Sequence, residues 1–117
     1  MHNKIRKRLL DTFKELRKEK ILPRANFMCC SKCASAVIWG SLLKEKHVGA
    51  VYWTRNDEEY FKQTGKIYLG YGSKDETDEK DILVGKQLVF KLRSFGLDVE
   101  WNGNPNEKVL VKGIKEA

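Results

Sequence analysis

The chain has 117 residues, 41% hydrophobic and 33% charged, which fits one small domain built around a single core. No stretch approaches the roughly 18 apolar residues of a membrane span, and no signal peptide follows Met1. We therefore expect a cytoplasmic protein without a membrane partner. The net charge of +7 is uneven, because residues 1–24 carry nine basic and three acidic side chains.

Residues 4–20 are predicted to form a basic amphipathic helix, since Ile5, Leu9, Phe13 and Leu16 recur at helical spacing. Its opposite side carries the lysines at positions 4, 7, 14 and 18 (Lys4, Lys7, Lys14, Lys18). Such a face can bind phosphates, but an ordinary solvated face has the same pattern. No recognised nucleic-acid motif follows, so weak nucleic-acid binding ranks third among the candidate functions.

The three cysteines of the chain, Cys29, Cys30 and Cys33, fall within five residues at the start of a predicted second helix over about 32–45, with Cys33 in its first turn. The simplest interpretation is that they fill the core, because cysteine is among the most buried residues. Two alternatives stay open. Zinc could bind here with His47 as a further ligand, or thiols at a helix N-terminus could serve redox exchange.

The rest of the chain alternates between strand and helix signals. We predict strands over 48–53, 66–72, 97–101 and 109–111, a short helix capped by Asn56 and ended by Gly65, and a long helix from the N-cap Thr77 to about 95. This order predicts a single α+β domain over 1–117, with a four-stranded, mainly antiparallel sheet and helices packed on it.

The strand over 66–72 also suggests a binding surface. Ile67, Leu69 and Tyr71 should face the core, which places the side chain of Tyr68 and the two glycines Gly70 and Gly72 on the other face. Glycine lets a ligand approach the backbone, and Ser73 adjoins the start of the long helix, which favours an anionic group. Alternatively, the glycines only make room for a helix packed on the sheet.

Three segments of the chain are distinctive: Asn26-Phe27-Met28-Cys29-Cys30-Ser31-Lys32-Cys33-Ala34, Ile67-Tyr68-Leu69-Gly70-Tyr71-Gly72, and Gly96-Leu97-Asp98-Val99-Glu100-Trp101-Asn102-Gly103. Together with the pairs Val84-Gly85 and Leu92-Arg93, they resemble a family of uncharacterised bacterial domains. The likeness extends roughly from Leu9 to Val111. The resemblance implies a bacterial or phage cytosolic protein and supplies no activity.

No complete catalytic set is present in the sequence, so an enzyme is the less favoured class. The leading hypothesis is a non-enzymatic cytosolic binding or regulatory module that acts on a protein partner or a small anionic ligand and needs no cofactor. The rival is a zinc-binding or thiol-redox protein centred on the cysteines. The sequence leaves the oligomeric state open.

Overall fold

In the computed structural model, which describes residues 2–115, the first helix forms where its apolar spacing predicts it. Helix α1 (Asn3–Lys18) buries Leu9, Phe13 and Leu16 against the sheet. Its C-terminus leads directly into a short strand that the sequence analysis missed.

The sheet has five strands in the order β1-β2-β3-β5-β4. The strands are β1 (Ile21–Arg24), β2 (Gly49–Tyr52), β3 (Ile67–Ser73), β4 (Leu97–Glu100) and β5 (Val109–Ile114). The pairs β2–β3, β3–β5 and β4–β5 are antiparallel, whereas β1 pairs with β2 in parallel. The prediction of an α+β domain is therefore confirmed, and the prediction of a four-stranded, mainly antiparallel sheet is corrected to a five-stranded mixed one.

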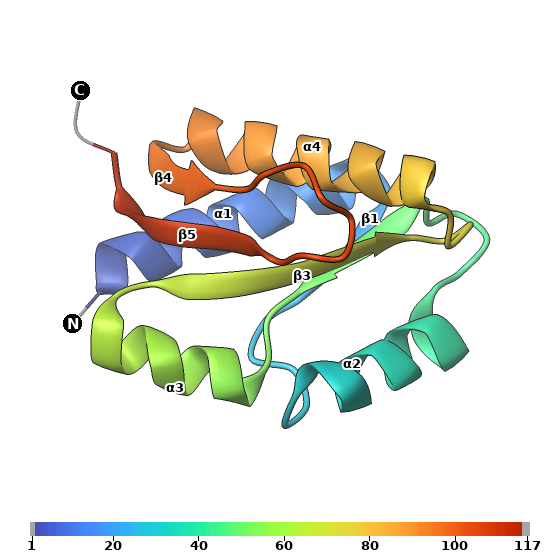
Figure 1. The fold of residues 1–117 in the computed structure, drawn as a ribbon, viewed down its shortest axis with the longest axis horizontal. Helices are drawn as coiled ribbons and strands as arrows, with labels where there is room; N and C mark the ends of the chain where they lie inside the picture. The colour runs from blue at the N-terminus through green and yellow to red at the C-terminus, as the bar shows by residue number, and fades with distance from the viewer. Residues whose placement is uncertain (1, 116–117) are drawn as a thin grey trace.

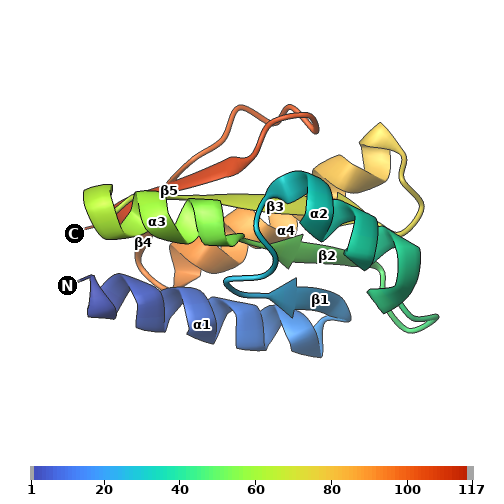
Figure 2. The same ribbon diagram turned by 90° about the horizontal axis from the view of Figure 1, so that it is seen from below.

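Strand β1 was missed because its sequence carries little strand signal. It has only four residues and includes Pro23, which cannot donate a backbone hydrogen bond. Proline is tolerated on an edge strand, and β1 lies at the edge of the sheet. Its first three residues are nevertheless buried, because α1 covers one side of the strand and α2 the other (Figure 2).

The helices divide into two groups around the sheet. Helix α1 and helix α4 (Asp78–Ser94) pack on one face and form the main core with β2, β3 and β5. Figure 1 shows α4 along one side of the sheet, with α2 and α3 along the other. None of the helices among residues 2–115 has the length and apolar character needed to cross a membrane.

The second group begins with α2 (Ser31–Val37), which continues as a π-helical turn, η1 (Ile38–Leu42). Apolar residues occur on all sides of this segment, which is typical of a helix buried all round, but the structure does not bury it in this way. Only Ala34 and Ile38 are buried, against Leu22, Ala50 and Tyr52 of the sheet. Trp39, Leu42 and Leu43 are partly buried against the same cluster, whereas Ala36, Gly40 and Ser41 on the outer side are exposed.

Helix α3 (Arg55–Thr64) starts two residues earlier than predicted. Its N-cap is Thr54, not Asn56, and Thr54 forms a capping box with Asp57, each side chain bonding the backbone of the other residue. Gly65 ends the helix as predicted, with φ of 76°. Thr77 caps α4, also as predicted.

A charged network ties the start of α1 to α3 and the core. The Arg6 guanidinium forms an ion pair with Glu58 and lies over the ring of Phe61, and Trp53 Nε1 donates to Glu58 Oε1 over 3.1 Å. The hydrogen bond from Arg6 is the main reason why the pKa of Glu58 lies below its ordinary value; burial opposes it and the bond from Trp53 supports it.

This network predicts a loss of stability in acid. A carboxyl group whose pKa is lower in the folded protein contributes its full stabilisation of the fold above its ordinary pKa of 4.5. This contribution is lost as the pH falls through the pKa that the group has in the folded state. We expect the thermal midpoint to fall on acidification from about pH 5 to about pH 3, and to fall less in Glu58→Gln. Thermal unfolding at several pH values measures both slopes, and equal slopes would show that Glu58 does not carry the effect.

Candidate cysteine site

The sulfur atoms of the three cysteines converge on one point of the surface. Their Sγ atoms all lie within 4.8 Å of one another. The Sγ atom of Cys29 is 3.4 Å from that of Cys33 and 3.7 Å from that of Cys30. All three are free thiols, Cys29 exposed and Cys30 and Cys33 partly exposed.

The prediction that these cysteines fill the core is wrong. Helix α2 turns Ala34 and Ile38 towards the sheet, so Cys33, one residue earlier, points to the side of that buried face. Cys29 and Cys30 precede the helix in a surface loop. The sequence pattern located the cluster correctly but not its burial.

The loop before the cysteines is shaped by two residues with left-handed backbone. Asn26 has φ of 50° and Met28 has φ of 62°. Asparagine adopts this conformation readily, whereas methionine seldom does, and so Met28 is a position of local backbone strain. The turn that results brings Cys29 and Cys30 back towards the first residues of α2.

Backbone hydrogen bonds fasten this loop to the junction of β2 and α3. The Phe27 N–H donates to the Trp53 carbonyl over 2.8 Å, Arg55 N–H donates to Met28 O over 3.0 Å, and Asn56 N–H donates to Cys29 O over 3.3 Å. Two of these donors belong to the first turn of α3, where backbone N–H groups lack partners within the helix. The loop that carries the cysteines is thus anchored to the β2–α3 junction, where Trp53 is buried and the first residues of α3 are exposed.

The thiols differ in acidity. The backbone N–H of Cys33 is the main cause that lowers the pKa of Cys30, and hydrogen bonds with the neighbouring sulfurs act in the same direction. The hydrogen bond with Cys29, followed by that with Cys30 and the charges of both, raises the pKa of Cys33 to about 11. Cys30 therefore loses its proton far more readily than Cys33.

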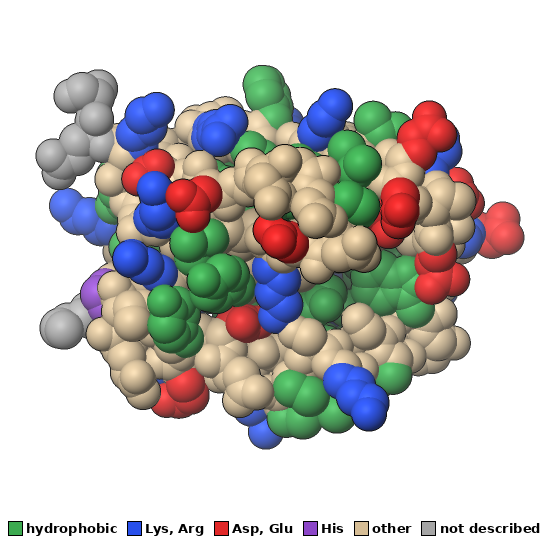
Figure 3. Space-filling model, in the orientation of Figure 1, with side chains coloured by type: hydrophobic (Ala, Val, Ile, Leu, Met, Phe, Trp, Pro, Cys, Tyr) green, Lys and Arg blue, Asp and Glu red, His purple; other side chains and the backbone are tan. Residues whose placement is uncertain are grey.

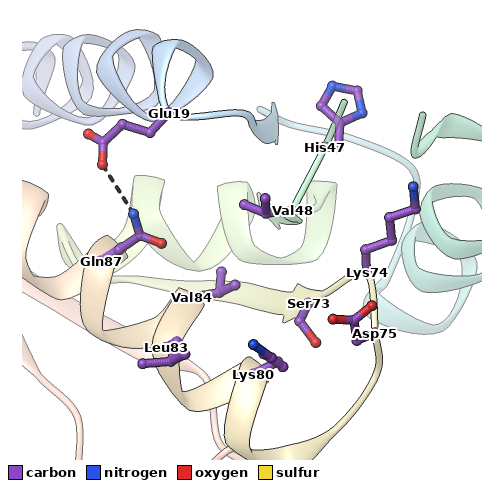
Figure 4. A pocket seen from close by; sticks show the side chains of 10 residues that line it. All are labelled: Glu19, His47, Val48, Ser73, Lys74, Asp75, Lys80, Leu83, Val84 and Gln87. Atoms are coloured by element: carbon purple, nitrogen blue, oxygen red, sulfur yellow. Dashed lines mark hydrogen bonds between the residues drawn. The ribbon is translucent and has the colours of Figure 1, made fainter. Parts of the chain in front are cut away.

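His47, the predicted fourth ligand, is not among the side chains that converge with the cysteines. It lines a separate pocket of about 470 Å³ between the end of α1, the 73–75 loop and α4 (Figure 4). Its Nδ1 accepts a hydrogen bond from the Lys44 N–H. Burial and then the charges of nearby basic residues, first Lys46, lower the pKa of His47, which favours the neutral ring.

The predicted binding surface on β3 is divided by the structure. Tyr68 is exposed and its ring lies 5.7 Å from that of Tyr60. Gly70 and Gly72 are covered, because a side chain there would overlap the rings of Tyr52 and Trp39 respectively. Gly70 thus makes room for Tyr52 of the neighbouring strand β2, and Gly72 makes room for Trp39 of η1. Ligand binding by this surface stays a prediction.

Ser73 is buried and lines the same pocket as His47. Its N–H and hydroxyl both donate to Asp81 Oδ1, over 2.7 and 2.8 Å. The Asp81 carboxylate of α4 therefore already accepts hydrogen bonds from the Ser73 groups that were predicted to bind an anionic ligand. No sequence pattern indicated this contact between Ser73 and Asp81.

The four lysines of the predicted basic face lie exposed on α1. Lys7 pairs with Asp11 over 3.0 Å, and Lys18 pairs with Glu15 over 3.2 Å. Lys4 and Lys14 take part in no ion pair among the described residues. These contacts reduce the charge available to phosphates, and nucleic-acid binding by this face remains a prediction.

Comparison with known proteins places the chain in a family without assigning it a role. The chain belongs to a family described as a domain of unknown function (DUF6891), which it matches over residues 4–115. This confirms the resemblance to a family of uncharacterised domains. No curated protein and no solved structure matches the chain.

Proposed function

We propose that this domain binds one thiophilic metal ion, zinc in the first instance, through Cys29, Cys30 and Cys33. The observation that carries the proposal is the convergence of three sulfur atoms within 4.8 Å on an anchored surface loop. Thiolates bind zinc with Zn–S distances of about 2.3 Å, so three sulfurs around one ion lie about 3.8 Å apart in tetrahedral geometry. The two shorter Sγ separations, 3.4 and 3.7 Å, are close to this spacing.

Three protein ligands leave the fourth position of a tetrahedral ion open. Structural zinc sites are usually closed by four protein ligands, whereas sites that exchange water or a substrate keep one position free. The exposure of Cys29 supports an ion that solvent or a partner can reach. The role we propose is therefore reversible binding or transfer of the ion, with the fold assembled independently of it.

The binding-module hypothesis is compatible with this role, because an ion with an open position can be completed by a ligand from a partner. The support for a separate partner surface at Tyr68 is its exposure and its contact with Tyr60. That support is weaker, since the neighbouring glycines lie under aromatic rings.

Zinc titration of the reduced protein tests the proposal. We expect one zinc ion per chain, and at least a tenfold loss of affinity in each of Cys29→Ser, Cys30→Ser and Cys33→Ser, because a neutral hydroxyl replaces a thiolate. Binding should strengthen as the pH rises, because the ion displaces thiol protons, above all that of Cys33. A competing chromophoric chelator measures the affinities, and elemental analysis gives the stoichiometry.

His47→Ala and Ser31→Ala are the matched controls, since neither side chain belongs to the sulfur cluster. Both should bind zinc as the unchanged protein does. Failure of the reduced protein to bind zinc would overturn the proposal. If the isolated protein instead lost two of its three free thiols on exposure to a small disulfide, redox exchange between Cys29 and Cys33 would be the better account.

A further inference from the structure

The outer face of α4 carries a regular stripe of exposed side chains, of which only Arg93 bonds to the rest of the described fold, through the Val99 carbonyl over 3.3 Å. Glu79, Leu83, Lys86, Phe90 and Arg93 follow one another at alternating spacings of four and three residues, which places them on one side of a helix. Phe90 is 69% exposed and Leu83 is 49% exposed. Figure 3 shows basic and apolar side chains alternating along the edge formed by α4, with acidic ones at one end.

The opposite side of α4 already packs against the rest of the fold. Val84, Leu88 and Leu92 are buried in the main core. Phe90 borders a hollow of about 480 Å³ whose other walls include Val89 and Trp101. Large apolar side chains beside an open hollow are characteristic of a surface that another molecule covers.

The charges of the stripe indicate which molecule this is. The stripe is acidic at Glu79 and basic at Arg93, and neither residue takes part in an ion pair within residues 2–115. A surface with opposite charges at its two ends and apolar groups between them is complementary to its own copy turned by 180°.

We propose that two copies of this chain associate through antiparallel α4 helices. A twofold axis beside Lys86 brings Glu79 opposite Arg93 of the second copy. The same axis, to within one residue, also brings Leu83 opposite Phe90 of the second copy. The leucine then fills the hollow next to the phenylalanine. Heptad-like spacing of this kind is the pattern by which helix pairs pack along a shared seam.

The same axis brings the two Lys86 side chains close together, which opposes association. The interface is also narrow, because it consists of one helix face with the hollow beside it. The dimer is therefore a weak, reversible one. It does not rest on the metal site, which lies on α2 and the loop before it.

Sedimentation equilibrium over a concentration series tests the dimer. A thiol reductant and a chelator are included, so that neither a disulfide through Cys29 nor a shared metal ion can link two chains. We expect reversible self-association, its loss in Phe90→Glu, and tighter association in Lys86→Ala. Leu10→Ser is the matched control, since Leu10 is 45% exposed, close to the 49% of Leu83, but lies on α1 beside Pro23 and Ala25.

Charge reversal gives the decisive comparison. Glu79→Arg and Arg93→Glu should each weaken association by roughly tenfold, because an attraction becomes a repulsion at both symmetric contacts. The double variant Glu79→Arg/Arg93→Glu should restore association. A protein that stays monomeric up to millimolar concentration, or a double variant no better than the single ones, would overturn the proposal. Circular dichroism confirms that each variant is folded.

Discussion

Replacing Trp53 by alanine is expected to lower the free energy of unfolding by about 3–5 kcal/mol, the range typical of large buried aromatic side chains. Trp53 is only 1% exposed, and its ring lies 5.0 Å from that of Phe13 on α1. The substitution leaves a cavity between α1 and the sheet and removes the indole donor that Glu58 accepts. Chemical denaturation followed by circular dichroism measures the change.

Tyr68→Ala is the control for this prediction, because it removes an aromatic ring that is 39% exposed. Its expected cost is below about 1 kcal/mol, which is typical of surface positions. Equal losses for the two variants would mean that Trp53 does not occupy the core position described here.

The second large effect is expected at Gly72. A β-carbon at this position would overlap the Trp39 ring, whose Nε1 donates to Ser73 O over 3.1 Å. Gly72→Ala should therefore push η1 away from β3 and cost about 1–3 kcal/mol, as overpacking in a core does. Because η1 continues α2, we also expect weaker zinc binding at the cysteines.

Gly40 offers a matched comparison on η1 itself. Apart from the two neighbouring residues and the backbone of its own helix, no atom of the described structure lies within 4 Å of a β-carbon built there, so Gly40→Ala should be neutral or stabilise the helix by up to about 1 kcal/mol. Unfolding by denaturant and zinc titration are measured on both variants. A stable Gly72→Ala protein with unchanged zinc affinity would show that the packing of Trp39 does not support the cysteine loop.

The parts of the fold that could be predicted have strong periodic signals. Helix α1 has apolar residues at regular helical spacing, and β3 alternates between Ile67, Leu69 and Tyr71 on one face and Tyr68 on the other. Strand β1 could not be predicted, because it is short and contains Pro23. It forms a buried strand only through its contacts with α1, α2 and β2, which lie elsewhere in the chain. The start of α3 was misplaced because Thr54 and Asn56 are both good caps, and only the bond to Asp57 distinguishes them.

The site was predicted less completely. The sequence located the cysteines, but the convergence of their sulfurs depends on left-handed backbone at Met28, for which methionine gives no signal. The sequence also offered His47 as a ligand because it is the one histidine beyond the N-terminal tail. The fold places it in the pocket that Ser73 lines instead. Contacts between residues far apart in the chain decide both outcomes.

X-ray absorption at the zinc edge of the zinc-loaded protein tests the proposed metal site most directly. Binding by Cys29, Cys30 and Cys33 predicts three sulfur neighbours at about 2.3 Å and one lighter ligand at about 2.0 Å. In Cys33→Ser any zinc that is still bound should show two sulfur neighbours. A spectrum of the unchanged protein with only nitrogen and oxygen neighbours would contradict the proposed site.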